Sequence, residues 1–398
     1  MKRQFESSHP WISFSASKIP RAGAKLWSLL GECQSKIDHI AGVPLRPDVA
    51  ATLHRLYLAK GALATTAIEG NTLSEAEALE AVEGTLSLPP SREYLANEIE
   101  NIIGAYNQML KQTSEGKLPR LTLESVKALN GEVLDGLTLD KDVVPGEIRK
   151  HSVGVSRYRG APAEDCGYLV SRLCEWLYSD ELKGHEGMDT IFAILRAVFA
   201  HLYIAWIHPF ADGNGRTARL VEYEILLACG VPSPAIHLLS NHYNKTRSEY
   251  YRQLERASTS GGDYVPFVEY AVQGFADGLK EQIAQIRQYQ LSVIWVNYVH
   301  ELFDDRKSPV DRRRRDLILD LSRSSNAVPL RKIKEISARV AASYAGRTSI
   351  TLDRDLVSVL RLGLVLRSKE GYLANKKLVE AFLPFRATTV IPSSTITD

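Results

Sequence analysis

The sequence predicts a mainly α-helical protein: a helical core with a projecting β-hairpin, followed by a small second domain of helices and strands. Apolar residues recur at three- and four-residue steps through most of the first 300 residues, for example from Val49 to Ile68. Between Pro145 and Pro162 the pattern changes to alternation with β-branched residues and glycine, which predicts a short hairpin. After residue 315, three short helical patterns precede two extended segments.

Periodicity and capping residues set the expected helix boundaries in the core. Ser74 and Glu77 have the spacing of a capping box. The apolar run Ile191–Ile207 approaches the length of a membrane span, but Arg196 and His201 interrupt it, so we predict a buried core helix. Helices are expected at residues 49–68, 74–83, 93–111, 122–134, 164–178, 189–207, 216–228, 245–258 and 264–300.

The charged, proline-containing segment 304–315 is the best domain boundary in the sequence. We therefore expect an N-terminal helical region at residues 1–110, a core at residues 111–303 and a winged-helix-like domain at residues 311–398. A chain of 398 residues is long enough for two or three such units, because single cores stop growing at roughly 250–300 residues.

The last domain is expected to hold three helices and a two-stranded ribbon, which is the composition of a winged helix. Arg347, Arg354, Arg361 and Arg367 lie around its third helix and the ribbon. This composition suits a nucleic-acid recognition helix, and it also suits a protein-docking or dimerisation surface, which we favour. The expected elements are helices at 317–322, 330–340 and 349–360 and strands at 365–367 and 371–373.

Overall composition is that of an ordinary globular protein. The 49 Lys and Arg residues nearly balance the 47 Asp and Glu residues, so the net charge of +2 gives no global reason to expect nucleic acid or a membrane surface as partner. The four cysteines are scattered, with no C-x-x-C pair for zinc or redox chemistry, and they suit a reducing compartment. The N-terminus lacks the apolar stretch of a secretory signal, so we expect a cytoplasmic location.

The segment IHPFADGNGRTAR, residues 207–219, has a residue inventory suited to phosphate. Gly213 and Gly215 permit a backbone whose N–H groups point inward, and the helix that follows offers its positive N-terminus to an anion. Arg216 and Arg219 are three residues apart on that helix, so both can reach a polyphosphate.

Two further residues of this segment add chemistry. Asp212 supplies an oxygen ligand for Mg²⁺, which normally binds through one or two carboxylates together with substrate phosphates. His208, at the mouth of the turn, can take a proton near neutral pH. The sequence therefore predicts an anion-binding turn with a base beside it.

Residues 208–219 also carry a family resemblance. HPFADGNGRTAR matches without a gap the H-P-F-x-x-G-N-G-R-x-x-R signature of Fic (Fic/Doc) proteins, enzymes that move AMP from ATP onto hydroxyl side chains. Pro145–Arg149, with the alternating segment after it, resembles the flap of that family, and Ser240–Leu254 resembles the segment that closes over the nucleotide base. The resemblance covers about residues 45–290 and implies a Fic-type helical core.

The resemblance implies roles in catalysis and metal binding. His208 would be the general base that deprotonates the target hydroxyl as this attacks the α-phosphate of ATP. Asp212 would hold Mg²⁺ bridging the α- and β-phosphates, and pyrophosphate would leave. Phosphoryl chemistry needs mainly positioning and charge neutralisation, and these residue types supply both.

Other matching residues would bind the nucleotide. Gly213, Asn214 and Gly215 would form the anion nest, Arg216 would hold the γ-phosphate, and Arg219 would hold the β/γ region. Flap residues Val153, Gly154, Val155 and Ser156 and the aromatic residue Tyr250 are the remaining residues that we expect to bind nucleotide.

A second segment resembles the inhibitory motif of these enzymes. Thr65, Glu69 and Gly70 stand at the matching positions of the pattern [S/T]-x-x-x-E-[G/N], N-terminal to the catalytic segment. In the class with an N-terminal inhibitory helix, Glu69 would pair with Arg216 and take the place that the γ-phosphate needs. Poor alignment of the reacting atoms would then slow turnover.

The sequence therefore predicts an autoinhibited protein adenylyltransferase that uses ATP and Mg²⁺ to modify a Ser, Thr or Tyr hydroxyl of a protein, itself included. One alternative is a nucleic-acid-binding regulator that acts through the winged helix, with the Fic core as nucleotide sensor. Another is AMP removal at the same site. A homodimer is a further expected partner, nucleic acid is less favoured, and no membrane partner is expected.

Overall fold

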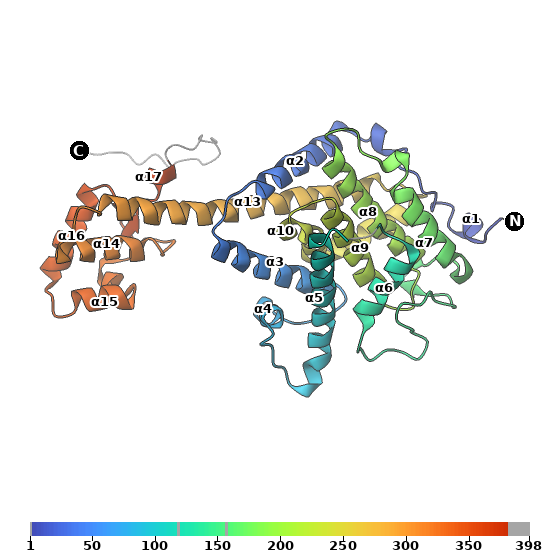
Figure 1. The fold of residues 1–398 in the computed structure, drawn as a ribbon, viewed down its shortest axis with the longest axis horizontal. Coiled ribbons are helices and arrows are strands. Elements are labelled where there is room, and N and C mark those ends of the chain that lie inside the picture. The colour runs from blue at the N-terminus through green and yellow to red at the C-terminus, as the bar shows by residue number, and fades with distance from the viewer. Residues whose placement is uncertain (1, 118–119, 156–157, 381–398) are drawn as a thin grey trace. The chain divides into compact units, whose positions relative to one another are not determined.

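The computed structural model describes residues 2–117, 120–155 and 158–380, and it is mainly helical, as predicted. The chain divides into two compact units, unit 1 (Met1–Ile283) and unit 2 (Ala284–Asp398). Figure 1 shows the helices of each unit in chain order.

Unit 1 contains most of the helices. The longer ones are amphipathic or wholly buried. Their bounds are α1 (Phe5–Ser8), α2 (Ala24–Ala41), α3 (Pro47–Ala67), α4 (Glu75–Glu83), α5 (Glu93–Ser114), α6 (Leu123–Leu134), α7 (Ala163–Leu177), α8 (Asp189–Ile207), α9 (Asn214–Ala228), α10 (Ser233–Ile236), α11 (Leu238–Lys245), α12 (Arg247–Thr259) and α13 (Val265–Leu302), the last of which continues into unit 2.

Helices α8 and α9 form the centre of unit 1 (Figure 1). Nearly every side chain of α8 is buried, and α9 buries even charged side chains such as Arg219 and Glu222. By length and composition α8 alone among the described helices could cross a membrane, but 83% of its apolar window is buried inside the protein. The predicted core helix at 189–207 is thus found with the same bounds.

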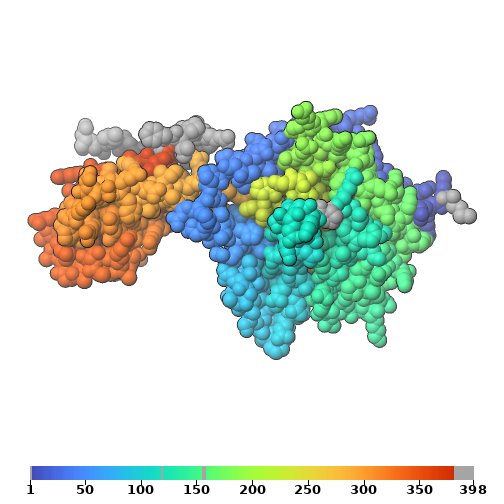
Figure 2. Space-filling view, in the orientation of Figure 1, coloured from blue at the N-terminus to red at the C-terminus, as the bar shows by residue number. Residues whose placement is uncertain are grey.

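Helices α3, α5 and α6 enclose α9 on one side, and α7 packs against α8. Figure 2 shows side chains of the blue-to-cyan segment, α3 to α5, beside those of α6 on one face of unit 1. The predicted capping box before α4 is confirmed: Ser74 Oγ accepts from the Glu77 backbone N–H, and the Glu77 carboxylate accepts from the Ser74 N–H.

The alternating segment forms two short strands, β1 (Gly154–Val155) and β2 (Tyr158–Arg159). They pair antiparallel, with Gly154 opposite Arg159 and Val155 opposite Tyr158. Ser156, one of the predicted flap residues, lies outside the described residues.

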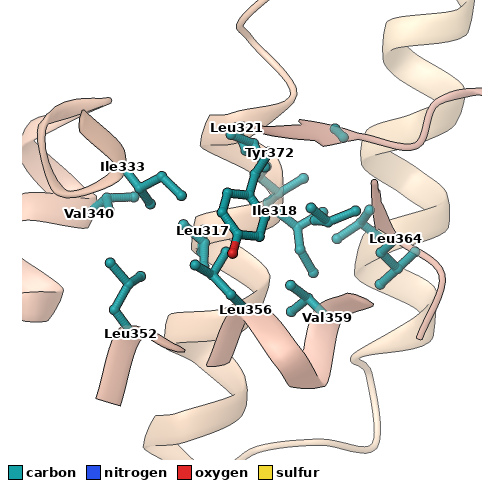
Figure 3. Packing of buried hydrophobic residues seen from close by; sticks show 14 of the residues in the cluster. Leu317, Ile318, Leu321, Ile333, Val340, Leu352, Leu356, Val359, Leu364 and Tyr372 are labelled. Carbon is teal, nitrogen blue, oxygen red and sulfur yellow. The ribbon is translucent and has the colours of Figure 1, made fainter. Parts of the chain in front are cut away.

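Unit 2 has its own core. Figure 3 shows Leu317 and Leu321 meeting Leu356 and Tyr372 in this cluster. β4 lies between β3 and the isolated pairing partner of Tyr372, Val328. The elements after α13 are α14 (Pro309–Leu321), the 3₁₀ segment η4 (Leu330–Glu335), α15 (Ala338–Tyr344), α16 (Ser349–Arg361), β3 (Val365–Arg367), β4 (Tyr372–Ala374) and α17 (Lys377–Glu380).

Several predicted boundaries differ from the structure. Residues 309–315, expected in a linker, are the first turns of α14, because Ser308 caps this helix and the arginines pair with acids of unit 2. The compact units divide at residue 283 inside α13 rather than near residue 304, and residues 1–110 belong to the same unit as the core. The helix expected at 245–258 is α12, which begins two residues later at Arg247, whereas α2 and α11 were not predicted.

A glycine in α3 offers a test of this packing. At Gly61 an added methyl group would overlap the buried His237 ring, whereas at Gly31 in α2 it would meet nothing. Gly61→Ala should therefore destabilise unit 1 by about 1–3 kcal/mol through overpacking. Gly31→Ala should stabilise it by about 0.5–1 kcal/mol, because alanine favours a helix. Urea unfolding of both variants followed by circular dichroism checks this, and equal effects would contradict it.

Candidate functional site

The turn between α8 and α9 is built from two left-handed residues. His208 ends α8 with φ 51° and ψ 59°, and Gly213 precedes α9 with φ 77°. A non-glycine residue with positive φ is uncommon and costs free energy. The surrounding structure therefore has to hold His208 in place, and three polar side chains do so.

The first is Asn214, whose amide bonds to both backbone groups of Phe210. Its Oδ1 accepts from the Phe210 N–H at 2.9 Å, and its Nδ2 donates to the Phe210 carbonyl at 2.8 Å. Both residues are buried. The Asn214 side chain therefore closes the turn, and only its backbone N–H remains for the predicted anion nest.

The second is Asn130 on α6, which sequence reasoning missed. Its Nδ2 donates to the Asp212 carbonyl at 3.0 Å and to Thr217 Oγ1 at 3.2 Å, while its Oδ1 accepts from the Gly146 N–H at 3.0 Å. One buried amide thus joins α6, the turn and the segment before the hairpin.

The third is Arg149, a buried arginine that bonds to backbone carbonyls. Its Nε donates to the His208 carbonyl at 2.7 Å, its Nη1 donates to the His151 carbonyl at 2.6 Å, and its Nη2 donates to the Ala161 carbonyl. No carboxylate among the described residues pairs with it. Gly160 packs so closely that an added Cβ would overlap both His208 and Arg149. Gly160, at the end of the hairpin, is therefore in close contact with His208.

These surroundings keep the imidazole of His208 neutral. Burial is the largest cause, and together with the Arg149 charge it lowers the pKa of His208 from 6.5 to about 4, although Glu69 and Asp212 act in the opposite direction. A neutral imidazole at pH 7 can accept a proton, which is what a general base requires.

Asp212 lies at the rim of the turn, with its side chain 51% exposed. Its Oδ1 accepts from the Gly213 N–H at 2.5 Å and lies 3.5 Å from Arg216 Nη2. No group of three or more His, Cys, Asp or Glu side chains in the described ranges is arranged to hold a metal. One accessible carboxylate nevertheless fits Mg²⁺ that arrives with a polyphosphate, because such Mg²⁺ takes its other ligands from phosphate and water.

The two arginines of α9 have different partners from those expected. Glu69 pairs with Arg219, not with Arg216: Arg219 Nη2 donates to Glu69 Oε1 at 2.6 Å and to the Thr65 carbonyl at 2.8 Å. Arg216 instead lies 3.3 Å from Glu98 Oε1 on α5. The predicted Glu69–Arg216 pair is therefore wrong, because Arg219 is the residue of α9 that faces the end of α3.

Glu69 lies over the first turn of α9. An added Cβ at Gly215 would overlap Glu69 Oε1, so the carboxylate occupies the helix N-terminus that was expected to bind phosphate. Burial alone would raise its pKa, but the charge and hydrogen bond of Arg219 outweigh burial and hold the pKa of Glu69 below its usual value. Glu69 is therefore ionised at neutral pH. Gly70, directly after it, has φ 110°.

The remaining predicted residues lie around this centre. Thr65 is fully buried, and its Oγ1 lies 3.2 Å from the Tyr106 hydroxyl. The Val153 carbonyl accepts from the Gly160 N–H at 3.1 Å. Tyr250 is buried, with its hydroxyl 2.8 Å from His201 Nε2, so it packs as a core residue here and its contact with adenine stays a prediction.

His201 is part of the buried core of unit 1. Its Nδ1 lies 3.1 Å from Glu222 Oε2, and Glu222 Oε1 accepts from the Tyr243 hydroxyl. All three side chains are buried. The group thus joins α8, α9 and α11, which carry His201, Glu222 and Tyr243.

Comparisons with known proteins agree with this geometry. Residues 120–226 match the Fic/DOC family, a span that includes Asn130, Arg149, the turn and both arginines but not Glu69. The chain is 29% identical over 225 residues to protein adenylyltransferase fic-1 of Caenorhabditis elegans, covering 56% of this chain and 40% of that protein. It is 30% identical over 206 residues to protein adenylyltransferase Fic of Drosophila virilis, covering 51% and 38%. The chain thus matches about two fifths of the length of these relatives.

Solved structures show a related fold. A Fic family protein from Desulfovibrio desulfuricans superposes with a TM-score of 0.56 at 20% identity, covering 88% of this chain and 93% of that one. Fic-1 of C. elegans superposes with a TM-score of 0.50 at 25% identity, covering 67% of this chain and 72% of that one. Residues 120–226, which hold the turn, its histidine and its arginines, thus resemble the Fic/DOC family, and the solved structures show a similar fold.

Proposed function

We propose that this chain is a protein adenylyltransferase that transfers AMP from ATP to a Ser, Thr or Tyr hydroxyl of a protein. The observation that carries the proposal is the turn itself, where a neutral imidazole stands beside a helix N-terminus that carries two arginines. The adenylyltransferase names of the relatives from C. elegans and D. virilis support the same reaction.

In the proposed reaction, His208 accepts the proton of the target hydroxyl. The hydroxyl oxygen forms a bond to the α-phosphorus, the bond from that phosphorus to the bridging oxygen breaks, and pyrophosphate leaves. Arg216 and Arg219 bind the leaving phosphates and stabilise the charge that develops on them. Mg²⁺, held by Asp212 and the phosphates, would neutralise further charge.

The pKa of His208 fits this role when ATP is considered. In the free protein burial holds the pKa near 4, which makes the imidazole a weak base. A triphosphate with net negative charge nearby favours the protonated form and raises this pKa. His208 therefore becomes a stronger base when the nucleotide binds, so its ability to accept a proton depends on the presence of ATP.

The hairpin is the proposed place of the protein target. Its pair of short strands stands next to His208 through Gly160, and an edge strand can pair with an extended segment of another chain. That pairing would bring a hydroxyl towards the imidazole. Modification of the chain itself and a homodimer remain predictions, which mass spectrometry of the isolated chain and light scattering can test.

We further propose that Glu69 inhibits the enzyme through Arg219. The carboxylate occupies the phosphate position at the N-terminus of α9 and holds the arginine needed by the β/γ-phosphates. Glu98 forms an ion pair with Arg216 in the same way. Each arginine must therefore break its ion pair before it can bind the phosphates of ATP in the orientation that in-line attack requires. AMP removal stays an alternative for this site, because Glu69 lies close enough to His208 to affect its pKa.

Removing the Glu69 carboxylate should raise AMP transfer. Glu69→Gly frees Arg219 and the helix N-terminus, and we expect AMP incorporation to rise by roughly 100-fold, the penalty typical of misplaced reacting atoms. Intact mass after incubation with ATP and Mg²⁺ measures the product. Glu83→Gly, at the exposed end of α4, is the matched control and should change nothing. His208→Ala in the Glu69→Gly background should abolish transfer, and persisting transfer would refute the assigned base.

The low pKa of His208 predicts an unusual pH profile in the Glu69→Gly variant. Because kcat/KM reports the free enzyme, its acid limb should lie at about pH 4 or below, since removing Glu69 takes away a charge that raises the pKa of His208. An unperturbed histidine would place it near pH 6.5, roughly its model-peptide pKa. The acid limb of kcat should lie at higher pH than that of kcat/KM, since bound nucleotide raises the pKa. Identical limbs near pH 6.5 would contradict the buried, neutral imidazole.

A further inference from the structure

The near-neutral charge of the chain hides a division between its two units. Unit 1 carries 29 Lys and Arg against 35 Asp and Glu, a net charge of −6. Unit 2 carries 20 Lys and Arg against 12 Asp and Glu, a net charge of +8 on far fewer residues. Such a basic small unit attracts polyanions, which the overall charge of +2 conceals.

The two buried acids of unit 2 pair with bases inside the unit. Asp355 is buried and accepts from Arg313 Nε at 2.7 Å and from Arg314 Nε at 2.8 Å. Asp320 is buried and accepts from Arg339 Nη2 at 2.7 Å. The arginines in these pairs lie on α14 and α15, so the bases of α16 and the ribbon are among those of unit 2 that no ion pair compensates.

The exposed face of α16 carries arginines that form no ion pair with the described residues. Leu352, Asp355, Leu356 and Val359 are buried against the rest of unit 2. On the opposite face, Ile350 and Val357 are 57% and 47% exposed, and Asp353 is an exposed acid among the bases there. Arg347, Arg354 and Arg361 are exposed on or beside α16, and none forms an ion pair with an acid of the described chain; on the ribbon, Arg367 and Lys369 are likewise exposed.

The order of elements matches a winged helix. Helix α14 is followed by the extended residue Val328, the helices α15 and α16, and the strands β3 and β4, and Val328 pairs with Tyr372 to add a third chain to the ribbon. In that architecture the second helix of the helix-turn-helix enters a groove of DNA. Here that helix is α16, the one with the exposed basic face.

We propose that unit 2 is a winged-helix domain that binds duplex DNA, with α16 in the major groove and the β3–β4 ribbon on the phosphates. The 13 residues of α16 span roughly 20 Å at about 1.5 Å per residue, enough to lie along a groove about 12 Å wide. The arginines contact phosphates, and Ile350 and Val357 meet the methyl groups of thymine. Double-stranded RNA is a poor fit because its deep, narrow major groove excludes side chains.

The test is binding of the full chain to a fluorescein-labelled 30-base-pair DNA of mixed sequence, followed by anisotropy between 50 and 200 mM KCl. The chain should bind, with affinity that falls steeply with salt. Replacing Arg347, Arg354 and Arg361 together by Gln should weaken binding by about tenfold or more and lower the salt slope by about 3, near one unit for each lost phosphate contact.

A matched variant distinguishes specific binding by the exposed face of α16 from attraction by the net positive charge of unit 2. Arg306, Lys307 and Lys377 are exposed bases of unit 2 on other segments, so replacing them by Gln removes the same charge. This variant should change affinity by less than about twofold, and both variants must keep the circular dichroism melting curve of the parent. Absence of DNA binding, equal loss in both variants, or equal binding to duplex RNA of the same sequence would overturn the proposal. The readout does not depend on AMP transfer.

Discussion

The site depends on a tight turn whose backbone polar groups cannot reach water. Between His208 and Gly213 the chain reverses inside the protein, and buried carbonyls and N–H groups there must find partners within it. Asn214, Asn130 and Arg149 supply these bonds from three different segments. The left-handed backbone of His208, and hence the direction of its imidazole, follows from them.

The same need for charge partners explains the resting state of the arginines. Arg219 is fully buried, and a buried guanidinium without an anion is costly. Glu69 satisfies it in the absence of nucleotide, at the place where a phosphate would otherwise do so. The contact that we propose as inhibitory would therefore also contribute to stability, since it neutralises the deeply buried charge of Arg219.

Sequence patterns predicted the parts of this protein that depend on local order. The bounds of α8, the capping box at Ser74 and the turn with its two arginines all follow from residues near one another in the chain. The pairing of Glu69 was predicted wrongly, because helical spacing places two arginines on one face without saying which neighbouring helix each one meets. Asn130 and Glu98 were missed for the same reason: their partners are distant in sequence, and no local signal marks an asparagine or glutamate as a partner of a remote turn.

The guanidinium of Arg149, which bonds to carbonyls but to no carboxylate of the described chain, has a consequence for the proposed proton transfer. It stays positively charged next to the imidazole, and together with burial it makes the imidazolium form of His208 unfavourable. Once the phosphates of a nucleotide leave, their charge no longer favours the protonated imidazole, although Glu69 and Asp212 still do so in part. In the proposed reaction, a pKa near 4 would let His208 release the proton to water at neutral pH and become a base again.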